Sequence, residues 1–276
     1  METKDIVVLA ILLTVALIEA CFTGFFRKAA QKTGDGLVDA LSTAALMLIS
    51  MPLGLLGGAF IASQFAARDA LIALPVLAQL GLLLVFDDMM QYWWHRLSHS
   101  ASWLYKLHRP HHNAEYMSVR MVYRNNFFYY LLMPSLWFSG ALVYLGLGPV
   151  YAVYVVVKMA VIIGAHSDVR WDAPLYRIKW LSPLMWLVER TISTPATHAA
   201  HHGKHAADGI TNYKGNFGNL LFFWDVLFGT AKITRRYPES FGVEKLPPTT
   251  VGEQLLWPLL RARLERGGEA SELARG

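Results

Sequence analysis

Long apolar runs separated by short polar stretches fill the first two thirds of the chain. The runs cover residues 6–25, 37–62, 71–86, 127–145 and 150–165. A run of about 20 apolar residues is long enough to cross a hydrocarbon core of roughly 30 Å as a helix. The pattern therefore predicts an all-α, polytopic membrane protein with about four to five transmembrane helices and a helical cap at one membrane face.

Two groups of helix breakers refine this expectation. Pro52, Gly54, Gly57 and Gly58 lie inside the second run and predict a bent helix, or a pair of helices that dips into the membrane and returns. The stretch 146–149, Gly-Leu-Gly-Pro, predicts a tight turn. The fourth and fifth runs are therefore expected to form a hairpin.

The first run has a competing interpretation as a signal peptide. We favour a membrane helix, because Glu2 and Asp5 offset Lys4 and the run is longer than the apolar part of a signal peptide. Three regions are then expected: N-terminal transmembrane helices at 1–94, a histidine-rich catalytic region at 95–235 that includes the hairpin at about 127–165, and a C-terminal polar tail at 236–276.

Composition and charge narrow the class of protein. Hydrophobic residues make up 54% of the chain and charged residues 16%, compared with about 25% charged residues in soluble domains. This balance argues against a soluble enzyme, a disordered chain and a coiled coil. Residues 1–94 carry a net charge of −3 and residues 95–276 a net charge of +8. The basic second half suits an anionic membrane surface, and the apolar runs beside it argue against nucleic acid.

The positions of Lys and Arg also predict an orientation. Short loops rich in these residues stay in the cytoplasm, which places the loop at 26–36 and the region at 91–126 inside. Residues 167–276 contain no run of spanning length. All ten histidines are therefore expected at the cytoplasmic face of a multi-pass membrane protein, for which we expect a bacterial inner membrane.

The chemistry of the chain is concentrated in its histidines, because the single cysteine, Cys21, excludes both an intramolecular disulfide and a thiolate metal cluster. The histidines form an HxxxH box, two HxxHH boxes and two further positions. On a helix, the i,i+3 and i,i+4 spacings turn the rings of one box toward a common side. All ten are candidate metal ligands: His95 and His99; His108, His111 and His112; His166; His198, His201 and His202; and His205.

The number of imidazoles indicates two metal ions, since one ion accepts four to six ligands. A lone histidine is more often structural, but neutral imidazoles gathered in three boxes cost desolvation unless their nitrogens are bound. Zinc rarely takes more than four ligands, and the first box, His-Arg-Leu-Ser-His, lacks the glutamate of the HExxH motif. An all-nitrogen, two-metal site in a membrane protein favours iron and dioxygen chemistry.

The order of the boxes resembles that of the fatty acid hydroxylase / sterol desaturase superfamily of integral-membrane di-iron oxygenases. The flanking residues match as well: Asp88, Tyr92 and His95-Arg96 are similar to the family's D-x3-Y-x2-HR entry to the first box. After the last box, the NYG…WDxxFGT segment of the family resembles the residues at 216–218, 224–225 and 228–230. The resemblance covers roughly residues 80–235.

This resemblance implies that the histidines of the three boxes hold two iron ions, Fe2+ or Fe3+, with His166 matching an additional family histidine. Two departures stand out. His205 replaces an asparagine of related members, so it is a further ligand, a hydrogen-bond donor behind the ligands, or neither. The stretch 209–215 looks like a small insertion. Asp88, Asp168 and Asp208 are expected to accept hydrogen bonds from ligand imidazoles, whereas Asp225 is expected to fix a turn.

The function implied by the resemblance is O2-dependent hydroxylation of a membrane lipid: a sterol, fatty acyl chain, aminolipid or carotenoid. Desaturation at the same site is the alternative. The chain shows no flavin, haem or nicotinamide motif, so electrons are expected from a ferredoxin, a cytochrome or a reductase. Three other functions are weighed against this one: a membrane zinc hydrolase, a metal transporter and a bis-histidine haem electron carrier.

Overall fold

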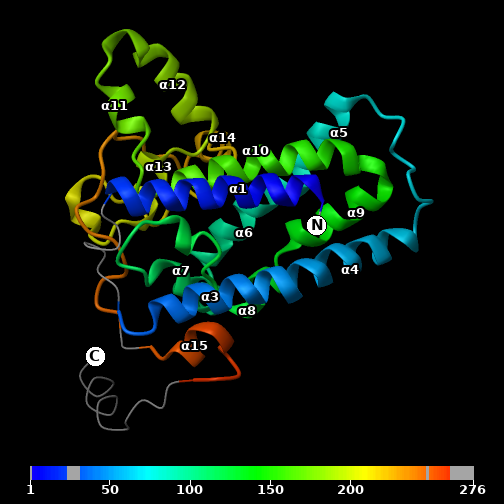
Figure 1. The fold of residues 1–276 in the computed structure, drawn as a ribbon, viewed down its shortest axis with the longest axis horizontal. Coiled ribbons are helices and arrows are strands. Elements are labelled where there is room, and N and C mark those ends of the chain that lie inside the picture. Colours follow the sequence, from blue (N-terminus) through cyan, green and yellow to red (C-terminus); the bar gives the residue numbers. More distant parts are fainter. Residues whose placement is uncertain (1, 24–31, 247–248, 262–276) are drawn as a thin grey trace.

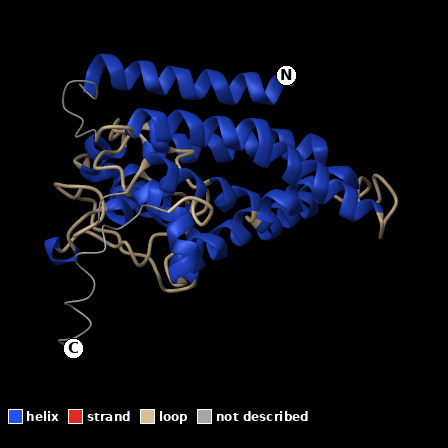
Figure 2. Cartoon of the chain, turned by 90° about the horizontal axis from the view of Figure 1, so that it is seen from below, coloured by secondary structure: helices blue, strands red, loops and turns tan. Residues whose placement is uncertain are grey.

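The computed structural model describes residues 2–23, 32–246 and 249–261. Within these ranges the chain forms helices joined by loops and contains no β-strand (Figure 1). The long helices run roughly side by side and most loops gather at one end (Figure 2). The prediction of an all-α fold is confirmed.

Three helical stretches are long and apolar enough to cross a membrane, and they span Thr3–Thr23, Asp35–Ser63 and Pro134–His166. The first contains α1 (Thr3–Ile18) and the π-helical turn η1 (Glu19–Thr23). The apolar character of these stretches leaves their outer faces rich in exposed leucine, valine and phenylalanine, as expected for lipid contact. The count of four to five spans stays a prediction.

The second run forms a single continuous helix rather than a pair that dips and returns. It consists of α3 (Asp35–Ala45), the π-helical turn η2 (Leu46–Ser50) and α4 (Met51–Ser63). The wider turn directly precedes Pro52, which has no N–H for the helical hydrogen-bond ladder. A local π-turn therefore accommodates the proline without ending the helix.

The glycines of this run allow a very close helix contact. A Cβ atom on Gly58 would lie 1.9 Å from the backbone oxygen of Trp137, and one on Gly140 would lie 2.1 Å from that of Leu55. Trp137 and Gly140 belong to α9 (Pro134–Leu142). Small residues spaced four apart let membrane helices approach this closely, so α4 and α9 pack backbone against backbone.

The predicted hairpin is present. The turn η5 (Val143–Leu147) contains Gly146 with φ of 108°, a conformation that favours glycine. α10 (Gly148–His166) then runs back with Pro149 in its first turn, as the position favours. The third stretch of spanning length is therefore broken at Gly146, and α9 and α10 run in opposite directions (Figure 1).

The third run becomes helical later than its apolar pattern suggests. Residues 70–74 form turns, and the amides of Asp69 and Leu71 bond to the carbonyls of Tyr144 and Leu145. Helix starts after Pro75, and its consecutive segments are α5 (Val76–Leu83), the π-helical turn η3 (Leu84–Met89) and α6 (Met90–Ser98). This continuous helix carries the first histidine box to the end where the loops gather.

Shorter elements complete that end of the molecule and position the site. They are α7 (Ser102–His112), η4 (Val119–Met121), α8 (Phe127–Leu131), α11 (Asp172–Tyr176), η6 (Lys179–Leu181), α12 (Ser182–Thr191), α13 (Pro195–His202), η7 (Ala206–Asp208), α14 (Phe223–Leu227) and α15 (Val251–Leu256). Residues 262–276 of the expected polar tail lie outside the described residues. Its described part includes α15, which packs near α3 and α7.

Candidate metal centre

Each histidine box is positioned by a helix end. His95 lies near the end of α6 and His99 follows its last residue, while α10 ends at His166. The second box closes α7 and the third closes α13. Thr194 caps α13 by accepting a hydrogen bond from the amide of Thr197, and a proline follows it, so the start of this helix is fixed.

Nine of the ten histidines fall into two groups whose ligand atoms lie within 4.8 Å of one another. We call the first the five-histidine group: His95, His99, His108, His112 and His201. The second is the four-histidine group: His111, His166, His198 and His202. Residues more than 100 positions apart in the sequence thus meet at one end of the helix bundle.

The two HxxHH boxes are divided between the groups in opposite ways. In the second box the outer pair, His108 and His112, joins the five-histidine group and His111 joins the other. In the third box the outer pair joins the four-histidine group and the middle histidine joins the five-histidine group. Helical geometry explains the division. Around the helix axis, position i+4 is rotated by about 40° from i in one direction, and position i+3 by about 60° in the other direction. Each HxxHH box therefore contributes histidines to both groups.

Burial keeps these imidazoles neutral. Except for the partly exposed His99, every ring in the two groups is at most 4% exposed. Burial, and then the proximity of the other rings, holds the pKa of His111, His112 and His202 well below the usual 6.5. Neutral imidazole is the form that binds a metal ion.

The ring nitrogens that face away from the groups are held by oxygen atoms. Nδ1 of His95 lies 2.8 Å from the carbonyl of Phe217, and Nδ1 of His201 lies 2.7 Å from that of Gly215. The carbonyls of Met121 and Ile162 face Nδ1 of His111 and His166 in the same way, and the side-chain oxygen of Asn125 faces His108. A hydrogen bond at Nδ1 fixes the ring so that Nε2 is available for a metal.

The opposite nitrogens fit a metal that is not part of the structure. The Nε2 atoms of His95, His99 and His201 are buried and have no hydrogen-bond partner among the described residues. In the four-histidine group, Nε2 of His198 lies 2.9 Å from that of His166 and 3.2 Å from that of His202. Lone pairs gathered without donors are costly unless a cation is bound, so the donor set suits two metal ions.

His205 lies apart from both groups. Its side chain is half exposed and its Nδ1 is 2.7 Å from a carboxylate oxygen of Glu244. It belongs to the segment after α13, where the backbone leaves the helix. The structure therefore does not bring this predicted ligand to the other nine.

Two of the three predicted carboxylates, those of Asp88 and Asp208, accept hydrogen bonds from backbone amides rather than from imidazoles. Asp88 accepts hydrogen bonds from the amides of Leu220 and Leu221 and from Nε1 of Trp224. Asp208 accepts hydrogen bonds from the amides of Ile210 and Thr211. The carboxylate of Asp168 lies 3.9 Å from the guanidinium of Arg170, and the backbone amide of Asp168 donates to Glu19. Asp88 acts on the site through the loop that carries the carbonyl bound to His95.

Asp225 fixes the same loop, in agreement with its predicted role. Its carboxylate accepts hydrogen bonds from the amides of Phe217 and Gly218, at 2.8 and 2.6 Å. It also accepts one from the hydroxyl of Thr230. Burial raises the pKa of Asp225, although these hydrogen bonds oppose the shift.

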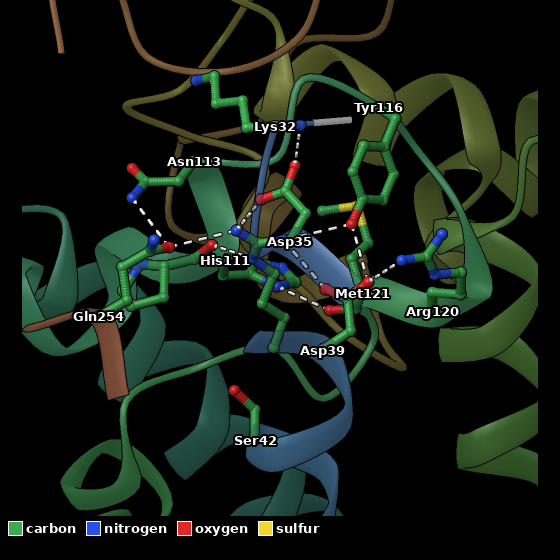
Figure 3. A network of polar contacts seen from close by, with 12 residues as sticks. Lys32, Asp35, Asp39, Ser42, His111, Asn113, Tyr116, Arg120, Met121 and Gln254 are labelled. Atoms are coloured by element: carbon green, nitrogen blue, oxygen red, sulfur yellow. Dashed lines mark hydrogen bonds and ion pairs between the residues drawn. The ribbon is translucent and has the colours of Figure 1, made fainter. Parts of the chain in front are cut away.

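A buried arginine behind the second box escaped the sequence analysis. Arg124 is fully buried, and its Nε donates to the carbonyl of Pro110, between two candidate ligands of α7. Its guanidinium also pairs with Asp35 and Asp39 of α3, at 2.6 and 3.0 Å. Figure 3 shows both carboxylates around this network. In the sequence, Arg124 looked like one more positive charge at the membrane face.

Glu19 forms a second link that the sequence does not reveal. Its buried carboxylate accepts hydrogen bonds from the hydroxyls of Ser118 and Ser167, both at 2.7 Å, and from the amides of Val119 and Asp168. Glu19 thereby connects the end of the first helix to the segment after His166 and to η4, which contains the Met121 carbonyl that faces His111.

Two cavities reach the histidines from different sides. A cavity of about 140 Å³, which we call the membrane-side cavity, is lined by His95, His108, His111 and His166 and by residues of α9 and α10. A cavity of about 300 Å³, which we call the outer cavity, is lined by His99 and His112 together with Tyr105, Lys204, Tyr213 and Lys214. The arrangement thus offers separate approaches to the two faces of the cluster.

Comparisons with known proteins agree with this geometry. Alkylglycerol monooxygenase from Danio rerio is 30% identical over 144 residues, and that from Homo sapiens is 28% identical over 144 residues. Each match covers 52% of this chain and 28% of the relative, so the chain matches little more than a quarter of the length of these relatives. No solved structure matches significantly.

The family comparison covers more than half of the chain. The family described as "Fatty acid hydroxylase" matches residues 80–230, which include all ten histidines and the loop at 215–217 that holds Nδ1 of His95 and His201. The relatives named above are vertebrate proteins, so the expected bacterial inner membrane stays a prediction, as does the cytoplasmic face. The chain belongs to the fatty acid hydroxylase family.

Proposed function

We propose that this protein is a membrane lipid monooxygenase whose two histidine groups hold two iron ions. The observation that carries the proposal is the division of nine imidazoles into two sets, each compact enough for one ion. Family membership supports the reaction class, and the three stretches of spanning length support a membrane setting.

Iron suits this site better than the other metals that bind imidazole. Both groups consist of nitrogen donors alone, and imidazole binds zinc, copper, iron and nickel. A zinc hydrolase needs a carboxylate base beside the metal, but the carboxylates near this cluster hold backbone amides. When bound, iron would supply redox chemistry with dioxygen that breaks an unactivated C–H bond.

The residues of the chain would orient the histidine rings, bind the lipid and shield the reacting centre from water. The carbonyls behind the Nδ1 atoms orient the rings, and the buried position of the cluster excludes bulk water from the reacting centre. The membrane-side cavity would hold the reacting part of the lipid beside His95, His108 and His111. No acid or base among these side chains is needed for the step.

The substrate and the electron source are parts of the same proposal. Two relatives are named for alkylglycerols, which makes an ether lipid the first candidate, ahead of the sterols, fatty acyl chains, aminolipids and carotenoids of the wider superfamily. Two electrons are required from a separate ferredoxin, cytochrome or reductase. The active site is proposed at the cytoplasmic face, where such donors are found.

The test is metal analysis of the purified protein together with lipid analysis of cells grown with and without it. We expect about two iron ions per chain and a lipid that gains one oxygen atom from ¹⁸O2. Loss of two hydrogens without oxygen gain would indicate desaturation at the same site. Zinc in place of iron, with lipid products that form without dioxygen, would show that the proposal is wrong.

A further inference from the structure

Two residues that line the membrane-side cavity each carry a buried side-chain oxygen with no hydrogen-bond partner among the described residues. The two residues are Gln91 and Ser135. Both residues line the cavity that reaches the histidines. Buried polar groups in native proteins are almost always paired, so unpaired oxygens on residues that line a cavity point to a ligand that supplies the partner.

Both residues lie close to the candidate metal centre. Gln91 precedes His95 by four residues on α6, which places them on the same helix face about 6 Å apart along the axis. The amide nitrogen of Gln91 is 3.8 Å from the sulfur of Met133, directly before α9, and Ser135 lies in the first turn of α9. Gln91 therefore lies about one helical turn from His95 of the five-histidine group, and Ser135 lies two residues after the Met133 that Gln91 contacts.

A second polar group lines the same cavity but needs no ligand. Nζ of Lys158 lies 2.5 Å from the carboxylate of Asp87, which also accepts a hydrogen bond of 2.7 Å from the hydroxyl of Tyr154. These three side chains satisfy one another. The contrast assigns ligand binding to Gln91 and Ser135 rather than to the ion pair.

We propose that Gln91 and Ser135 bind a hydroxyl group of the lipid substrate close to the carbon that is oxidised. The proposal rests on the function proposed above. The amide oxygen of Gln91 requires a donor, and the hydroxyl of Ser135 can donate to an oxygen, so a substrate hydroxyl completes both. The substrate class is a lipid alcohol, and a plain hydrocarbon tail would leave both atoms unpaired.

The position of the pair also limits where oxidation occurs. A carbon chain advances about 1.3 Å per bond, so the separation of about 6 Å between Gln91 and His95 along the helix axis corresponds to about five covalent bonds. The oxidised carbon and the existing hydroxyl oxygen should therefore be separated by no more than about five bonds.

The first experiment needs no variant. Cells that produce the full chain are grown under ¹⁸O2, and tandem mass spectrometry locates the label in the extracted lipids. We expect the label within about five bonds of a hydroxyl oxygen that was present before the reaction. A label on a remote carbon, or on a lipid without a hydroxyl, overturns this inference and leaves the proposed function intact. The absence of any labelled lipid overturns both.

The second experiment tests the two residues with the unlabelled precursor of that lipid as substrate. Gln91→Leu and Ser135→Ala should each raise KM about fivefold to tenfold while kcat changes less than twofold, because a lost hydrogen bond weakens binding without touching the metal ligands. Ser50→Ala is the matched control, since Ser50 is a buried serine with an unpaired hydroxyl that does not line this cavity.

Iron content separates binding from folding in these variants. Each variant should keep the iron content of the wild type. An unchanged KM in both cavity variants, or a rise of equal size in Ser50→Ala, overturns the assignment of these residues. If a variant loses its iron, the position of the ¹⁸O label in the wild-type product still decides the inference.

Discussion

The five-histidine group and the four-histidine group are built from the same kinds of box, but their surroundings differ. The five-histidine group lines both cavities: His99 and His112 face the outer cavity, and His95 and His108 face the membrane-side cavity. All four rings of the four-histidine group are buried. Two of them, His111 and His166, line the membrane-side cavity, and none of the four lines the outer cavity. Similar sequence motifs have thus produced two histidine groups with chemically unequal surroundings.

The supports of the two groups differ as well. The loop at 215–217 holds Nδ1 of His95 and His201 in the five-histidine group. The four-histidine group depends instead on carbonyls of η4 and α10, at Met121 and Ile162. The two histidine groups can therefore be disturbed separately. We expect the largest effects when a candidate ligand is removed, or when a buried support shared by both groups is replaced.

Removing one ligand from each group should have the largest effect. We expect His111→Ala and His201→Ala each to abolish product, with a loss of at least about 100-fold, because even partners behind a metal ligand account for 10- to 100-fold in affinity. Bound iron should fall in both variants, as measured by mass spectrometry of the metal. Full activity in either variant would contradict the ligand assignment.

Replacing the buried arginine should disturb both groups together. Arg124→Met leaves Asp35 and Asp39 buried without their partner and frees the carbonyl of Pro110, so we expect a loss of stability of about 3–5 kcal/mol. Thermal unfolding in detergent and iron content measure the effect. Arg68→Met, at an exposed arginine, is the control and should change neither.

Replacing Glu19 should act mainly on the four-histidine group. Glu19→Gln removes the charge that receives four hydrogen bonds from the segments around Val119 and Ser167. We expect about a tenfold loss of iron affinity at that group, so that about half of the iron is lost at limiting iron concentration. Loss of all iron would show that the two groups do not separate in this way. Glu2→Gln, at an exposed position, serves as the control.

Replacing Asp88 should act mainly on the five-histidine group, and more weakly. Asp88→Asn keeps one acceptor oxygen but weakens the bonds to Leu220, Leu221 and Trp224. We expect a loss of iron affinity of a few fold at the five-histidine group, measured by titration with iron. An effect larger than that of Glu19→Gln would reverse the expected order.

Replacing His205 should have the smallest effect. His205→Ala removes an exposed hydrogen bond to Glu244, and exposed pairs contribute about 0–1 kcal/mol. We expect iron content and product formation within about twofold of the wild type. A large loss of iron would place His205 among the ligands after all.

The apolar runs were sufficient to predict the helical class, and the spacing within each box predicted which rings share a helix face. The convergence of the boxes was predicted from the number of imidazoles and the family resemblance, because local spacing does not relate distant segments. The partners behind the ligands could not be predicted. Most are backbone carbonyls, such as those of Phe217 and Gly215, which have no sequence signature. Glu19 and Arg124 act over separations of about 100 and 90 residues, and sequence spacing contains no information about such pairs. Asp88 and Asp208 were therefore expected to face imidazoles, although their carboxylates hold loops.

The contact between α4 and α9 has a consequence for how a lipid reaches the cavity. At Gly58 and Gly140 the two backbones meet with no space for even one methyl group. An acyl chain is wider than a methyl group, so it cannot pass between these helices at this level. The contact between α4 and α9 is therefore closed to lipid at this level, and a lipid that enters from the bilayer must pass between other helices.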